Sequence, residues 1–216
     1  LLSRQAVTSL SNFRKTFRSA FNVISIFALW FSTYIFLMSD WIVRIIGGTS
    51  FLSASPVLKI LSFAILLIFF GNLGGHAIIA LNLQKKALWI YLGGAVLNIG
   101  LNVLLIPRYS YFATAVTTVI TEVFITISMF WLLQRAAKIT INKSVLGRTI
   151  FIVLLTAFLM YLYKDSFIKA SLISLIYYPL LLIAGVFTRD DLQEIISLKK
   201  SPKLSGEIED SIGVPS

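Results

Sequence analysis

Long apolar runs separated by short polar segments make up most of the chain. A helix needs about 20 mostly apolar residues to cross the hydrocarbon of a bilayer. Six runs reach this length, near residues 19–38, 57–81, 87–106, 112–133, 146–163 and 168–187. The pattern therefore predicts about six transmembrane helices. Only Lys164, Asp165 and Ser166 separate the last two runs. We expect a tight helical hairpin there, because unpaired backbone groups are costly in lipid.

Three local features modify this picture. Residues 41–46 are apolar but too short to span, and two glycines then interrupt them. We expect this stretch to lie at the outer membrane interface, with Trp41 as an anchor. Pro107 is expected to end the third helix, and Pro179 to kink the sixth.

The two ends of the chain carry different signals. The chain begins at Leu1 rather than Met, and its first 18 residues lack the apolar core of a signal peptide. We therefore expect a fragment without its original N-terminus. Residues 188–191 resemble a helix N-cap followed by carboxylates, which predicts a short amphipathic helix through Lys200. We divide the chain into a membrane lobe over 1–187 and a cytoplasmic tail over 188–216, whose last part is expected to be disordered.

Composition supports a membrane environment and excludes several classes of protein. Hydrophobic residues make up 57% of the chain and charged residues 13%, with a mean hydropathy of +0.88. A soluble domain of 216 residues cannot bury that much apolar surface. We therefore expect an all-α, polytopic bundle of membrane helices. The chain has no cysteine and one histidine, which excludes disulfides, cysteine zinc sites and thiol nucleophiles. We expect no enzyme activity, no metal and no cofactor.

Basic residues alternate between the two sides of the predicted bundle. Of the 19 Lys and Arg, most lie before the first run, between the second and third, between the fourth and fifth, and after the sixth. Lys and Arg gather in cytoplasmic loops, so both ends of this chain are predicted to be cytoplasmic. The residues on that side are Arg4, Arg14, Lys15, Arg18, Lys85, Lys86, Arg135, Lys138, Lys143, Arg148, Arg189, Lys199, Lys200 and Lys203.

Two ionisable side chains lie within the predicted spans, where such groups are expensive and are often functional. Glu122 is far from both ends of its run, and Thr114, Thr118 and Thr126 repeat at steps of four around it. These residues share one stripe of the helix, which we expect to face protein or water. Two roles are open, contact with a polar substrate or cation, and packing in which the hydroxyls satisfy the carboxyl. His76 follows a glycine-rich stretch, and we favour a structural role over titration.

Two further sets of polar residues are candidates. Asn98 and Asn102 lie one turn apart in the third run and share a helix face with Gly94. We favour interhelical packing for this face over the lining of a hydrophilic cavity. Lys85 and Lys86 occupy a short loop, and their expected role is to set the topology. Recognition of phosphate is the alternative.

The order of the motifs resembles a known family. Residues 41–48 (WIVRIIGG), 79–86 (IALNLQKK) and 97–107 (LNIGLNVLLIP) precede Thr121-Glu122 in the next helix. This order resembles the C-terminal half of the Wzx-like polysaccharide biosynthesis proteins, the O-antigen flippases of the multidrug/oligosaccharidyl-lipid/polysaccharide exporter superfamily. The resemblance covers roughly residues 24–133. The chain departs from the family at residues 108–112 (RYSYF), where a glycine-rich turn is usual.

The resemblance implies a fold and a function. The chain would form one lobe of a two-lobe, MATE-like transporter in the bacterial inner membrane. The transporter would move undecaprenyl-diphosphate-linked oligosaccharides for lipopolysaccharide O-antigen, capsule or exopolysaccharide. Its partners would be an N-terminal lobe of the same protein, membrane lipids and the polysaccharide polymerase machinery. The candidate cavity residues are Glu122, Asn98, Asn102, Thr118 and His76, with Lys85 and Lys86 as possible phosphate contacts.

Four alternatives remain open from the sequence. A cation-coupled multidrug antiporter of the same superfamily would be expected to have more buried carboxylates than Glu122 alone. A lipid II flippase would be expected to have more cationic residues within its spans. A membrane-embedded enzyme of polysaccharide assembly would need a catalytic domain, for which the connections are too short, or clustered His, Asp and Arg at a membrane surface, which the sequence lacks. A structural scaffold would use the polar stripes for packing only.

Overall fold

The computed structural model describes residues 10–186, and all the regular structure in this range is helical. Five helices are long and apolar enough to cross a membrane. The expected all-α, polytopic membrane bundle is therefore confirmed for the described residues. The long helices are α2 (Leu10–Gly47), α3 (Ser55–Ala80), α4 (Gln84–Tyr109), α5 (Tyr111–Ala137) and α6 (Lys143–Leu162). The short ones are η1 (Thr49–Ala54), α7 (Phe167–Leu175) and α8 (Tyr177–Ile183).

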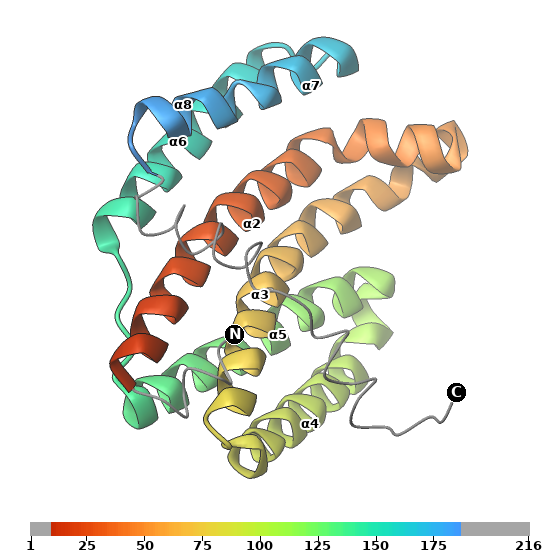
Figure 1. The fold of residues 1–216 in the computed structure, drawn as a ribbon. Helices are drawn as coiled ribbons and strands as arrows, with labels where there is room; N and C mark the ends of the chain where they lie inside the picture. Colours follow the sequence, from red (N-terminus) through yellow and green to blue (C-terminus); the bar gives the residue numbers. More distant parts are fainter. Residues whose placement is uncertain (1–9, 187–216) are drawn as a thin grey trace, which may run out of the picture.

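The helices form two groups that share α2 (Figure 1). In the first group, α3 packs between α2 and α5, and α5 carries α4. In the second group, α6 packs on α2, while α7 and α8 fold back along α6. In the view of Figure 1 the two groups lie on either side of the long red and orange ribbon of α2. Apart from the shared α2, the helices of each group follow one another along the chain and are joined by short connections.

The first group is held by an aromatic and aliphatic core. Phe13 and Phe17 are four residues apart on α2, so they lie on one helix face, and both are fully buried. They pack with Leu73 of α3 and with Met129 and Leu133 of α5. The second group has its own cluster around α6 and α8, which includes residues 26, 145, 152, 153, 177, 181 and 186. A third cluster joins Met38 of α2 to Met160 of α6 and Ala170 of α7. Successive segments of α2 therefore contribute to separate cores.

The helix α2 is longer at both ends than the sequence pattern predicts. It already includes Phe13 and Phe17, and at the other end it continues through residues 41–46 as far as Gly47. Residues 41–46 are therefore not a separate segment, because no residue before Gly47 interrupts the helix. Their expected position at the outer membrane interface stays a prediction. Gly48 then has a φ of +77°, a conformation that glycine adopts without strain. The chain turns there into η1 and returns along α3.

The sixth predicted span is divided in two. It consists of α7 and α8, which meet at Ile176 and together cover Phe167–Ile183. Pro179 cannot donate a backbone hydrogen bond to the carbonyl of residue 175, so the expected kink has a physical cause at this break. The hairpin between the fifth and sixth spans is confirmed, since α6 ends at Leu162 and α7 begins at Phe167.

Two other predictions concern helix ends. Pro107 does not end the third helix, because α4 includes it in its last turn and continues to Tyr109. The turn comes at Ser110, where φ is +52°. The amphipathic helix expected after Thr188 and the polar tail lie outside the described residues.

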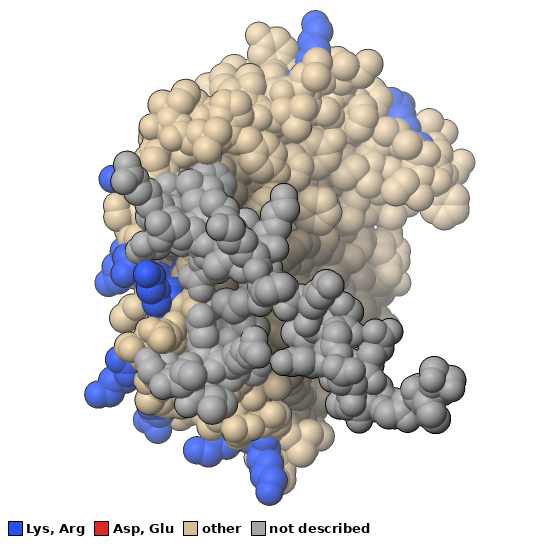
Figure 2. Space-filling model, viewed as in Figure 1, with Lys and Arg blue, Asp and Glu red and all other residues tan. Residues whose placement is uncertain are grey.

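The basic residues gather towards one end of the bundle. The start of α2, the turn between α3 and α4, and the loop between α5 and α6 lie at the same end (Figure 1). Nine of the basic residues that the sequence assigns to the cytoplasmic side lie in these segments or in the adjoining helix ends. Figure 2 shows Lys and Arg along the lower and left edges of the visible face, with a few at the upper end. The cytoplasmic orientation of this end stays a prediction.

Candidate functional site

A series of amide and hydroxyl groups joins α4 to α5 near the middle of both helices. Asn102 Nδ2 donates to Asn98 Oδ1 at 2.9 Å, and Asn98 Nδ2 donates to Thr121 Oγ1 at 3.2 Å. The helices approach closely here because Gly94 has no side chain, and a Cβ atom there would lie 2.8 Å from Ile125. Amides and small residues of this kind hold membrane helices together. We define Asn98, Asn102, Thr117 and Thr121 as the polar ladder.

One end of the polar ladder holds two buried oxygens without hydrogen-bond partners among the described residues. These atoms are Asn102 Oδ1 and Thr117 Oγ1. Because α4 and α5 are joined by a tight turn and run antiparallel, Asn102 and Thr117 lie at the same level, one turn beyond the pair formed by Asn98 and Thr121. Thr121, in contrast, accepts from Asn98 and donates to the backbone oxygen of Thr117 at 2.8 Å. The polar ladder is therefore only partly satisfied.

Glu122 is partly buried on α5, beside the polar ladder. Thr126, one turn further along, donates to the backbone oxygen of Leu67 on α3 at 3.3 Å. Tyr91 of α4 lies near enough to interact electrostatically with the Glu122 carboxyl. The carboxyl is therefore on the part of α5 that faces between α3 and α4. The described residues give it no hydrogen bond and no ion pair.

The predicted threonine stripe has mixed surroundings. Thr118 donates to the backbone oxygen of Thr114 at 2.8 Å, so its hydroxyl is used within its own helix. Thr114 is exposed, whereas Thr126 is buried against α3. The stripe therefore runs from the surface of α5 into its contact with α3. None of these hydroxyls bonds to Glu122, so the packing interpretation that they satisfy the carboxyl has no support in these contacts.

The structure does not bring the other candidate residues to the same place. His76 is exposed on α3, and the neighbouring Gly75 is the residue that approaches Tyr91, whose hydroxyl lies 3.7 Å from a Cβ built there. Lys85 and Lys86 are exposed in the first turn of α4. With a rise of 1.5 Å per residue, Lys86 lies roughly 18 Å along the helix from Asn98.

Two members of the polar ladder, Thr117 and Thr121, were not among the sequence candidates. Their four-residue spacing matches that of Asn98 and Asn102, so a search for pairs of polar residues one turn apart on neighbouring spans would find them. Within residues 10–186 no group of three His, Cys, Asp or Glu side chains could hold a metal ion. The arrangement offers uncharged hydrogen-bonding groups and one carboxyl within the membrane.

Comparison with known proteins supports the membrane assignment but gives no family. A stretch of 97 residues, 44% of the chain, is 32% identical to an uncharacterized membrane protein of Methanocaldococcus jannaschii. The chain is a multi-pass membrane protein. The match spans 18% of the length of that relative, so the two share one segment. No family model matches the chain, and no solved structure matches it.

These comparisons bear on function only at the level of a membrane protein. The helices fit a transporter, and the archaeal relative is described as a membrane protein without a stated activity. The comparisons provide no evidence for the polysaccharide flippase family. That resemblance therefore depends on the order of the sequence motifs alone.

Proposed function

We propose that this chain is part of a transporter that moves an undecaprenyl-diphosphate-linked oligosaccharide across the bacterial inner membrane. The motif order between residues 41 and 122 supports this proposal, together with the five apolar helices long enough to span. The chain would form one lobe, and an N-terminal lobe of the same protein would complete the transporter. The glycan would serve O-antigen, capsule or exopolysaccharide assembly and then pass to polymerase machinery.

The observation that carries this proposal is the Glu122 carboxyl. Among residues 10–186 the other two carboxylates are Asp40, about two turns before the end of α2, and Asp165, in the loop between α6 and α7, whereas Glu122 lies in the middle of α5. Asp40 also has partners, Ser55 and Lys59, while Glu122 has no hydrogen bond or ion pair there. An ionisable group within a span is expensive, and such groups often belong to a substrate or ion pathway.

The proposed transport requires no covalent chemistry, and we expect no enzyme activity. The lobes must shelter a sugar chain and a diphosphate from hydrocarbon while the lipid tail stays in the bilayer. Transporters of this general kind alternate access by moving one half against the other around a central site. Glu122 would offer a charge or a hydrogen-bond acceptor to sugar hydroxyls, and the polar ladder would hold α4 beside it.

The test is complementation of a bacterium that lacks its own O-antigen or capsule flippase. The full-length gene should restore surface polysaccharide, and Glu122→Gln should reduce the restored signal at equal protein abundance. Asp165→Asn is the matched control, because it also neutralises a carboxylate but lies in the loop between α6 and α7. It should restore polysaccharide to the level of the unmodified protein. Asn98→Ala measures how much the polar ladder contributes to restoring surface polysaccharide.

Three outcomes would count against parts of this proposal. No restoration despite good membrane expression would reject glycan flipping, and a gain in drug resistance would then favour the cation-coupled antiporter. Full activity of both Glu122→Gln and Asn98→Ala would leave these residues with a packing role only. Equal loss in Glu122→Gln and Asp165→Asn would show that the effect is not specific to the membrane carboxyl.

A further inference from the structure

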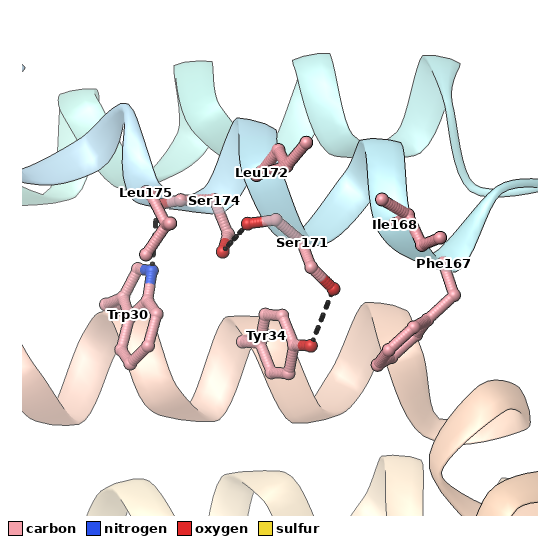
Figure 3. Close-up of a pocket in the computed structure, with 8 residues that line it drawn as sticks. All are labelled: Trp30, Tyr34, Phe167, Ile168, Ser171, Leu172, Ser174 and Leu175. Carbon is pink, nitrogen blue, oxygen red and sulfur yellow. Dashed lines mark hydrogen bonds between the residues drawn. The ribbon is translucent and has the colours of Figure 1, made fainter.

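A groove of about 460 Å³ lies between α2 and α7, on the side of the molecule away from the polar ladder. Its walls are almost entirely apolar. Figure 3 shows that α2 contributes two aromatic rings, which point towards α7, while the other six residues come from α7. The lining residues are Trp30, Tyr34, Phe167, Ile168, Ser171, Leu172, Ser174 and Leu175. The volume falls in the range of ligand-binding clefts, roughly 300–1,000 Å³.

The polar atoms in the groove are already paired with one another. The Trp30 indole donates to the backbone oxygen of Ser174 at 3.1 Å, and Tyr34 and Ser171 share a hydrogen bond of 2.9 Å between their hydroxyls. Ser174 Oγ donates to the backbone oxygen of Ser171 at 2.7 Å (Figure 3). A ligand with polar groups would have to compete with these bonds. The groove therefore favours hydrocarbon.

The direction of the groove matches the path of a lipid chain. Phe167 is the first residue of α7, directly after the loop from α6, and Leu175 is the last. Between them the helix rises about 12 Å, so the groove extends from the end of a span towards its middle. An acyl chain follows the same course, from the headgroup region into the hydrocarbon.

Two basic residues lie near the end of the groove at Phe167. The ring of Phe167 lies 6.0 Å from that of Trp41, whose indole donates to the backbone oxygen of Lys164 at 2.9 Å. Tryptophan typically lies at the level of lipid headgroups. Lys164 and Lys169 are both exposed, three residues before and two residues after Phe167. Asp165 and Asp40 add negative charge at this end, but Asp40 is paired with Lys59, and Arg44 lies 5.6 Å from the Trp41 ring. The net charge stays positive, which complements an anionic headgroup.

The geometry points to a bound anionic glycerophospholipid, with one acyl chain in the groove between α2 and α7 and its phosphate beside Lys164 and Lys169. The lipid would fill the space between the two helices, whose direct contacts include the two hydrogen bonds from Trp30 and Tyr34. Filling an apolar space restores dispersion contacts that its walls otherwise lack. This inference does not depend on the proposed transport of a glycan.

The test measures lipid bound to the full-length protein by native mass spectrometry after delipidation in mild detergent. Phosphatidylglycerol and phosphatidylcholine of equal chain length are added back in turn. Leu172→Trp places a larger side chain in the groove and should lower phosphatidylglycerol binding at least fivefold. The matched control is Leu154→Trp, since Leu154 is 63% exposed on α6 and outside the groove, against 60% for Leu172. Ile168→Trp, also in the groove, replaces Leu172→Trp if that variant does not fold.

The headgroup contact is tested separately. The unmodified protein should bind phosphatidylglycerol more tightly than phosphatidylcholine. Lys164→Gln and Lys169→Gln should each reduce this preference roughly fivefold, the factor typical of one basic residue near an anionic surface. Retention of the preference in the double variant would overturn the phosphate contact.

Two further results would overturn the inference as a whole. Equal binding by Leu172→Trp and Leu154→Trp would show that the lipid is not in the groove. Displacement of phosphatidylglycerol by a polyisoprenyl phosphate at lower concentration would identify an isoprenoid chain, not an acyl chain, as the occupant. A failed complementation assay would leave these binding results unchanged, so the two proposals fail independently.

Discussion

Replacement of Thr117 by valine should stabilise the protein. The Thr117 side chain is fully buried between α4 and α5, and its hydroxyl has no partner among the described residues. Valine has the same shape but no hydroxyl, so the substitution removes an unpaired polar group without leaving a cavity. An unsatisfied buried hydroxyl costs about 1–3 kcal/mol. We therefore expect a gain of about 1–2 kcal/mol in the free energy of unfolding.

Thr121→Val is the matched control, because it makes the same substitution one turn away in the same interface. Thr121 accepts from Asn98 and donates to a backbone oxygen. Loss of the Thr121 hydroxyl should destabilise the protein by about 0.6 kcal/mol, the average for hydrogen bonds between membrane helices, and by at most about 1.7 kcal/mol. Thermal unfolding in a mild detergent, followed by circular dichroism, would distinguish the Tm of Thr117→Val from that of Thr121→Val. A change of 1 kcal/mol shifts Tm by roughly 2–4 °C at this chain length. A fall in Tm for Thr117→Val similar to that of Thr121→Val would refute the reasoning.

Three further substitutions test the packing. Gly94→Ala should destabilise by about 1–3 kcal/mol, because its Cβ would press on Ile125, whereas Gly100→Ala on the same helix meets no atom within 4 Å and should be tolerated. Equal Tm values for the two would contradict this. Arg14→Ala removes the Nε hydrogen bond of 2.5 Å to the last turn of α5 and should lower stability by about 1–2 kcal/mol in a denaturant titration. Trp41→Phe keeps an aromatic side chain but loses the indole hydrogen bond to the loop after α6, so hydrogen exchange should be faster in that loop and unchanged in α4.

The positions of the long helices follow from the sequence because each apolar run has little choice of structure in lipid. A run of about 20 apolar residues must pair its backbone groups internally, and charges or turns mark its ends. This argument locates α3 to α6 well. It fails at the ends of α2, where Phe13 and Phe17 form part of the core in a segment that also carries Arg14, Lys15 and Arg18. A search for uniformly apolar runs misses this amphipathic segment, because basic side chains lie among its apolar residues.

The candidate site shows a different limit of prediction. Steps of four residues correctly place Asn98 and Asn102 on one face of α4, since they bond to each other. The partners on α5 depend on which helix faces that side, and this follows from tertiary packing rather than from local pattern. For the same reason the sequence does not show that the hydroxyls of Thr118 and Thr126 bond to backbone oxygens and give Glu122 no hydrogen bond among the described residues.

The shared helix α2 has a mechanical consequence. Ser32 Oγ donates to the backbone oxygen of Ser62 on α3 at 2.6 Å, while Tyr177 donates to the backbone oxygen of Ile26 at 2.9 Å from α8. Both groups of helices therefore hydrogen-bond to neighbouring turns of α2. Insertion of a single residue between these positions and the core around Phe17 would rotate the remainder by about 100°. Both groups of helices would then lose their contacts with α2, because the rotation of α2 about its axis sets the position of both groups.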